Sequence, residues 1–83
     1  MRDKLTENQI DICEHIAERV SFVQYSQVVH AFRSNRWDKL VEARIRAVER
    51  YNTRLRAQDR TDFIAVPDYD ETMKLITRVR EQH

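Results

Sequence analysis

The first apolar positions of the chain recur every three or four residues, which is the spacing of a helix with one buried face. Thr6 and Gln9 stand three residues apart at the start of this pattern, as in a capping box, and Leu5 and Ile10 have the spacing of a hydrophobic staple. We therefore predict a helix that begins near Thr6. Its inward residues are Ile10, Cys13, Ile16, Ala17 and Val20.

A second set of apolar positions with helical spacing follows the first, but it is out of register with the period of the first set. Ser21 or Gln24 marks a break or kink between two helices, and one continuous helix to Phe32 is the alternative. The inward residues of this second face are Phe22, Tyr25, Val28, Val29 and Phe32.

The longest periodic stretch, from about Arg36 to Gln58, predicts the longest helix. The pair Ser34-Asn35 precedes it and supplies its predicted N-cap. One side of this helix is apolar. The apolar residues are Trp37, Leu40, Val41, Val48, Tyr51 and Leu55.

The helical period breaks between Asp59 and Pro67. Because Pro67 disfavours helical backbone at the residue before it, this segment is predicted to be extended. Its apolar residues, Phe63, Ile64 and Val66, are expected to cover the core.

A final helix is predicted after Asp68, which has the N-cap position relative to Glu71. Its inward residues are Tyr69, Met73, Ile76 and Val79. These patterns together predict an all-α protein: a compact bundle of three to four helices with one long central helix. The 83 residues form a single helical domain (1–83). A domain of this size buries only about 60% of its unfolded surface, so we also expect a homo-oligomer, most simply a homodimer.

No residue arrangement typical of a catalytic or metal site is present. The chain has no glycine, which excludes Gly-rich phosphate loops, and no Ser or Cys has a His placed by a catalytic motif. Cys13 and His15 are two residues apart and hence on different helical faces, and Cys13 fits a small core residue. Helix capping explains Asp68, Asp70 and Glu71 without a cation. We therefore expect no enzyme, no metal, no cofactor and no small-molecule substrate.

The N-terminal residues lack the apolar stretch of a signal peptide, and no apolar run approaches the ~20 residues that span a bilayer. A single cysteine cannot form an internal disulfide. We expect a cytoplasmic protein that does not contact membrane.

The charges are balanced overall but unevenly placed. Charged residues make up 35% of the chain, and the net charge is +1. Residues 1–32 and 61–83 each carry a net charge of −2, whereas residues 33–60 carry nine basic groups against four acidic ones. This asymmetry is informative about partners rather than about fold.

Five basic residues form a row about 27 Å long on the polar side of the long helix. No acidic residue falls in this arc, because Asp38, Glu42 and Glu49 lie beside it. We call this row the basic stripe. It consists of Arg36, Lys39, Arg46, Arg50 and Arg54.

The basic stripe has three interpretations. Guanidinium groups bind phosphate oxygens bidentately, so the stripe suits contact with the backbone of nucleic acid. Alternatively, it is a solvated face on which Glu42 pairs with Arg46. In the third interpretation it meets an acidic ridge on the first helix, within one subunit or across two. The acidic ridge consists of Glu7, Asp11, Glu14 and Glu18.

Arg44 projects into the apolar face of the long helix, between Leu40, Val41, Val48 and Tyr51. A buried charge without a partner is costly, so its guanidinium must either reach solvent along its methylenes or find a partner. A salt bridge to a carboxylate of a second subunit would place Arg44 in a dimer interface with the acidic ridge.

A helix-turn-helix motif is disfavoured by its register. The stretch from Gln9 to Asn35 has a suitable length, but with Ala17 at the small position two polar residues occupy inward positions of the second helix. These residues are Gln27 and His30.

The sequence therefore favours a small non-enzymatic accessory or regulatory protein that binds nucleic acid through the basic stripe. Phosphate contacts are expected, and base readout is not. The alternative is a protein-binding adaptor or inhibitor whose charged helical faces dock on a protein partner with an acidic surface.

Overall fold

The computed structural model describes residues 4–82, which form four helices and no strand. The helices are α1 (Glu7–Arg19), α2 (Tyr25–Ser34), α3 (Trp37–Ala57) and α4 (Tyr69–Glu81). α1 packs against α2 and α4, and α3 packs against the same two helices. The predicted all-α bundle is confirmed, and α3 begins and ends within one residue of its predicted limits. None of these helices is long and apolar enough to cross a membrane.

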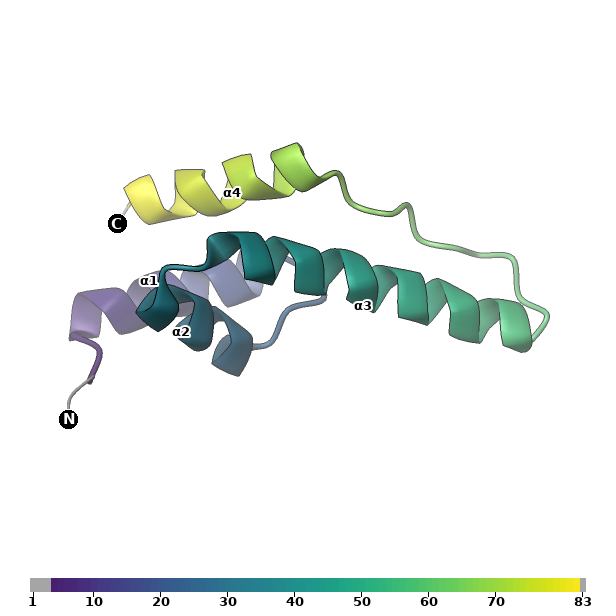
Figure 1. The fold of residues 1–83 in the computed structure, drawn as a ribbon, viewed down its shortest axis with the longest axis horizontal. Helices are drawn as coiled ribbons and strands as arrows, with labels where there is room; N and C mark the ends of the chain where they lie inside the picture. Colours follow the sequence, from purple (N-terminus) through teal and green to yellow (C-terminus); the bar gives the residue numbers. More distant parts are fainter. Residues whose placement is uncertain (1–3, 83) are drawn as a thin grey trace.

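The bundle is elongated because α3 extends beyond the helices that cover its first half (Figure 1). Its extents are 47 × 25 × 18 Å, and its radius of gyration of 14.3 Å exceeds the roughly 12 Å of a compact chain of this length. α4 runs back antiparallel over the first half of α3, and the connection between them follows the outer half (Figure 1). The outer half of α3 therefore offers a long surface to solvent.

The core is formed by one face of each helix, largely as predicted. Burial of a large aliphatic side chain contributes about 1.5–3 kcal/mol. Cys13 is fully buried among these residues, and burial raises the pKa of its thiol. The buried residues of the main cluster are Ile12, Cys13, Ile16, Val20, Val28, Ala31, Trp37, Leu40, Val41, Ile76 and Val79.

The predicted starts of α1 and α4 are confirmed by their caps. Thr6 Oγ1 accepts the Gln9 N–H at 3.2 Å, and Gln9 Oε1 accepts the Thr6 N–H at 2.8 Å, which completes a capping box. Asp68 Oδ2 accepts the Glu71 N–H at 3.0 Å. Each cap satisfies a backbone donor that has no partner within its helix.

The junction between α2 and α3 differs from its prediction. Ser34 is the last residue of α2, and its hydroxyl donates to the His30 carbonyl at 2.8 Å instead of capping α3. Asn35 ends α2 in the left-handed conformation, with φ of 55°, and Arg36 occupies the N-cap of α3 without a side-chain cap. Asn tolerates left-handed backbone better than most residues, so it can make this tight turn in a chain without glycine.

The predicted break between the first two helices is confirmed, but its aromatic residues are more exposed than expected. Phe22 and Tyr25 are 37% and 42% exposed, whereas α2 buries Val28, as predicted, and also Ala31. Phe22 has left-handed backbone, with φ of 66°. For a residue with a Cβ this conformation costs roughly 1–2 kcal/mol. The Phe22 and Tyr51 rings pack edge to face with centroids 5.6 Å apart.

The extended segment lies along α3. The prediction that it covers the core is wrong. Phe63, Ile64 and Val66 remain 44%, 38% and 51% exposed. Asn52 holds the segment, since its amide donates to the Ile64 carbonyl at 2.8 Å and accepts the Ile64 N–H at 2.9 Å. The Arg56 guanidinium lies over the Phe63 ring, 5.3 Å from its centroid.

Tyr69 also departs from its predicted inward position and is 38% exposed. It is the first residue of α4, and the buried residue of that end of the helix is Thr72. The apolar period alone missed Thr72 because its hydroxyl is polar.

Candidate nucleic-acid interface

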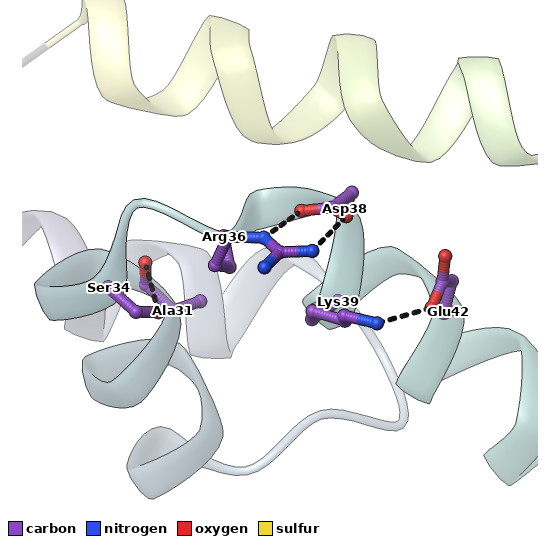
Figure 2. Close-up of polar contacts among 6 residues, drawn as sticks. All are labelled: Ala31, Ser34, Arg36, Asp38, Lys39 and Glu42. Atoms are coloured by element: carbon purple, nitrogen blue, oxygen red, sulfur yellow. Dashed lines mark hydrogen bonds and ion pairs between the residues drawn. The ribbon is translucent and has the colours of Figure 1, made fainter.

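All five residues of the basic stripe are exposed, but the two nearest the start of α3 are held in ion pairs. Arg36 Nε and Nη2 donate to the two oxygens of Asp38 at 3.2 and 3.1 Å (Figure 2). Lys39 Nζ lies 3.9 Å from Glu42 Oε1 (Figure 2). The hydrogen bonds between Arg36 and Asp38 lower the pKa of the carboxyl and raise that of the guanidinium. Exposed pairs of this kind contribute little to stability, so an incoming phosphate can displace them.

The side chains of the other three residues of the stripe form no ion pair or hydrogen bond with another residue of 4–82. We call Arg46, Arg50 and Arg54 the distal arginines. They are four residues apart and therefore follow one face of α3 at intervals of about 6 Å. Glu42, the expected partner of Arg46 on a solvated face, pairs with Lys39 instead. The donors of the distal arginines are thus free for a ligand.

A groove of about 580 Å³ lies between α2 and α3, beside the start of the basic stripe. Its floor is apolar and contains Ala31, Leu40 and Ala43. Arg36 and Lys39 line its α3 side, and none of the described residues that line it is acidic. The groove thus adds a hollow to the basic face at the end nearest α2.

The α2 side of the groove is polar. The sequence pattern assigned none of these residues to a site, and the only signal was that Gln27 and His30 are polar where a helix-turn-helix needs apolar residues. α2 buries Val28 and Ala31, which leaves both polar side chains exposed along the groove. The α2 residues that line the groove, besides Ala31, are Ser26, Gln27, His30 and Ser34.

The groove and the distal arginines share one face of α3. Ala43 lies in the groove, and Arg46 and Arg50 follow it three and seven residues later, which are neighbouring positions on a helix surface. α3 projects beyond α2, and the distal arginines follow it from its middle into this projecting part (Figure 1). A linear anion seated in the groove can therefore continue along this face.

Arg44, for which the sequence leaves solvent and a dimer interface as alternatives, has partners within its own chain. Its Nη1 donates to Thr72 Oγ1 at 2.6 Å, its Nε to the Ser21 carbonyl at 3.1 Å, and its Nη2 to Ser21 Oγ at 3.1 Å. None of these partners is charged, and burial lowers the pKa of the guanidinium. Arg44 therefore joins α3 to α4 and to the turn after α1, and the intersubunit salt bridge stays a prediction.

The acidic ridge is exposed on α1 and lies apart from the basic stripe. α1 packs against α2 and α4 but not against α3, and no ion pair joins the ridge to the stripe within residues 4–82. Asp11 pairs with His15 on its own helix, with Oδ1 3.6 Å from Nδ1. The interpretation in which the ridge meets the stripe within one subunit is therefore wrong. A contact between two subunits stays open.

In the described part of the chain, no three His, Cys, Asp or Glu side chains are grouped to hold a metal ion. The three acidic residues at the start of α4 act there as a cap and first turn. They are Asp68, Asp70 and Glu71.

Comparison with known proteins gives no relative. No family model matches the chain, and no curated protein or solved structure is significantly similar to it.

Proposed function

We propose that this protein is a non-enzymatic accessory or regulatory protein of the cytoplasm that binds nucleic acid through the exposed face of α3. The contact residues are Arg36, Lys39, Arg46, Arg50 and Arg54. The observation that carries the proposal is the row of distal arginines, which are exposed and have no ion-pair partner within residues 4–82.

The distal arginines suit phosphate because their guanidinium forks can each bind two phosphate oxygens. Binding also releases the counterions condensed on nucleic acid, which supplies most of the non-specific affinity. Arg36 and Lys39 must first exchange Asp38 and Glu42 for phosphate, so we expect smaller contributions from them. Three strong contacts, rather than five, are therefore expected.

The salt dependence of binding tests this proposal directly. The logarithm of the affinity for a generic duplex should fall linearly with the logarithm of salt concentration, with a slope of about −3 for three phosphate contacts. The double variant Arg46→Glu with Arg50→Glu should abolish binding at low salt while its circular dichroism spectrum stays helical. Both side chains are exposed, so loss of fold is not expected.

The matched control is Lys74→Glu with Arg78→Glu on α4. These two residues are also exposed and four apart, and the substitutions change the net charge by the same amount. The control should bind like the wild type if the α3 face is responsible. Equal loss in both double variants would mean that only the overall charge matters, and no affinity of the wild type for duplex or single strand would refute the proposal.

The second candidate is an adaptor or inhibitor that docks on a protein partner. It is favoured by the exposed apolar run of the extended segment, because such side chains are typical of protein contacts. A pull-down should compare the wild type with the double variant Arg46→Glu and Arg50→Glu. This candidate is supported if the wild type retains a protein that the variant loses and does not retain nucleic acid.

A further inference from the structure

Phosphate binding alone does not require the groove between α2 and α3. A phosphate on a helix surface needs donors and positive charge, and the distal arginines supply both without any hollow. The groove volume of about 580 Å³ instead falls within the range of sites that enclose small organic groups. Its apolar floor and polar rim are also typical of such sites.

The rim of the groove offers both donors and acceptors. Gln27 Oε1 accepts the Gln24 N–H at 2.8 Å, which leaves the two amide hydrogens of Gln27 free. The Ser34 hydroxyl donates to the Ala31 carbonyl at 3.5 Å (Figure 2) and to the His30 carbonyl at 2.8 Å. Its oxygen can therefore still accept. The ring nitrogens of His30 provide a donor and an acceptor. A planar heterocycle with ring nitrogens and exocyclic groups matches this mixture.

The floor of the groove complements the flat faces of such a heterocycle. Ala31 and Leu40 are 3% exposed and give the groove a rigid aliphatic base, and Ala43 widens it because its side chain is a single methyl. No Phe, Tyr or Trp is among the described residues that line the groove, and the His30 imidazole is the one aromatic ring among them. A base here gains apolar contact and can stack on no ring larger than the His30 imidazole, so its contribution should lie at the low end for base stacking, about five- to tenfold in affinity.

The surroundings of the groove favour a base that belongs to a polyanion. Arg36 and Lys39 stand on its α3 side, and the distal arginines continue along the same helix face. A strand whose base enters the groove can thus place its next phosphates on the basic stripe. None of the described lining residues carries a negative charge that would oppose this.

We infer that the groove between α2 and α3 receives one unpaired base of a single-stranded nucleic acid, while the distal arginines hold its phosphates. The inference rests on the proposed function and specifies its ligand. In a duplex the bases are stacked and present only their edges, so they cannot enter a hollow between two helices. An unpaired base can turn outward, which is how proteins usually recognise single strands.

The test compares three probes of equal phosphate number: a short mixed-sequence single strand, a duplex half as long, and the same strand with abasic nucleotides throughout. The wild type should bind the intact single strand about five- to tenfold more tightly than the abasic strand. The variant Ala43→Leu fills the groove and should lose this difference while keeping its affinity for the abasic strand. Ala57→Leu is the matched control, because Ala57 is exposed on the same face of α3 outside the groove and should retain the difference.

Thermal unfolding shows whether Ala43→Leu is folded, and if it is not, Gln27→Ala with His30→Ala tests the exposed rim in its place. Equal affinity of the wild type for the intact strand, the abasic strand and the duplex would overturn the inference and leave the proposed function standing. A difference between intact and abasic strands that survives a folded Ala43→Leu and the rim variant would also overturn it. Absence of binding to every probe would refute the proposed function, and the inference with it.

Discussion

Arg44 and Thr72, 28 residues apart in the chain, meet where α4 packs on α3, and Arg44 Nη1 donates to Thr72 Oγ1 at 2.6 Å. Thr72 is 1% exposed and is the only buried polar side chain in the described part of the protein. The pair explains how a cation is tolerated in an apolar helix face. Its guanidinium is satisfied by hydroxyl and carbonyl oxygens, and no carboxylate is needed.

Thr72→Val should therefore destabilise the protein although it keeps the shape of the side chain. The substitution leaves an Arg44 N–H without its acceptor, and loss of a partner of a charged donor costs about 1–3 kcal/mol. Urea unfolding measures the effect. Thr53→Val is the control, because the Thr53 hydroxyl only donates to the Glu49 carbonyl of its own helix on the surface. Equal unfolding free energies for the two variants would contradict this role of Thr72.

Asn52→Ala should release the extended segment from α3. The Asn52 amide makes both hydrogen bonds to the Ile64 backbone, at 2.8 and 2.9 Å, and its loss should cost about 1 kcal/mol. Hydrogen exchange at the Ile64 amide should accelerate strongly, while exchange in the buried turns of α1 stays unchanged. Asn52→Asp keeps the acceptor of the Ile64 N–H and should accelerate exchange less. Unchanged exchange at Ile64 in the alanine variant would contradict the contact.

At Asn35, which has left-handed backbone, a glycine variant should be more stable than an alanine variant, the reverse of the usual order within a helix. Asn35→Ala should destabilise the protein by roughly 1–2 kcal/mol, because a Cβ opposes φ of 55°, whereas Asn35→Gly should be nearly neutral. Asn8 is the control, since it is exposed within α1. There, alanine should be more stable than glycine by about 1 kcal/mol. Thermal unfolding of the four variants checks the reversal, and the same ranking at both positions would contradict it.

Stability should fall at acidic pH in part through two exposed pairs. Hydrogen bonds from Arg36 and Arg60 lower the pKa of Asp38 and Asp62 in the folded protein. A carboxyl whose pKa is lower in the folded than in the unfolded protein stabilises the fold above the unfolded pKa of about 3.9. This stabilisation is lost as the pH falls from the unfolded pKa through the folded pKa. Arg36→Gln with Arg60→Gln should therefore show a smaller loss of unfolding free energy below about pH 4.

The control for the acid measurement is Arg50→Gln with Arg54→Gln, which removes the same charge from residues without an ion-pair partner in 4–82. This variant should keep the acid dependence of the wild type. The same acid dependence in all three proteins would show that the two pairs do not contribute.

Self-association is expected at micromolar concentration because the core of a domain this small is limited. Sedimentation equilibrium should give a mass of at least twice 10.1 kDa. If the ridge of one subunit meets the stripe of another, Glu14→Lys with Glu18→Lys should dissociate the protein. Adding Arg46→Glu and Arg50→Glu to that variant should restore association, because the charges are again complementary. A 10.1 kDa monomer throughout a wide concentration range would rule out the dimer.

Local interactions explain what could be predicted from the sequence. Thr6 and Asp68 each cap a helix by bonding to a residue three positions later. The limits of α3 follow from an apolar period of about 3.6 residues. The caps and the helix limits therefore depend only on residues close together in the sequence. The exposure of the basic stripe followed from the same period. Ser34-Asn35 shows the limit of such patterns, because a cap-forming pair can equally end one helix as begin the next.

The tertiary structure alone decided which distant residues meet. Arg44 bonds to Ser21 and Thr72, and Asn52 bonds to Ile64, only because helices and loops pack in one particular arrangement. The groove exists because Asn35 turns α2 back against α3, which brings Gln27 and His30 beside a stripe that the sequence shows only as a row on one helix. Helical periodicity specifies the face on which a residue lies, but packing specifies what that face meets.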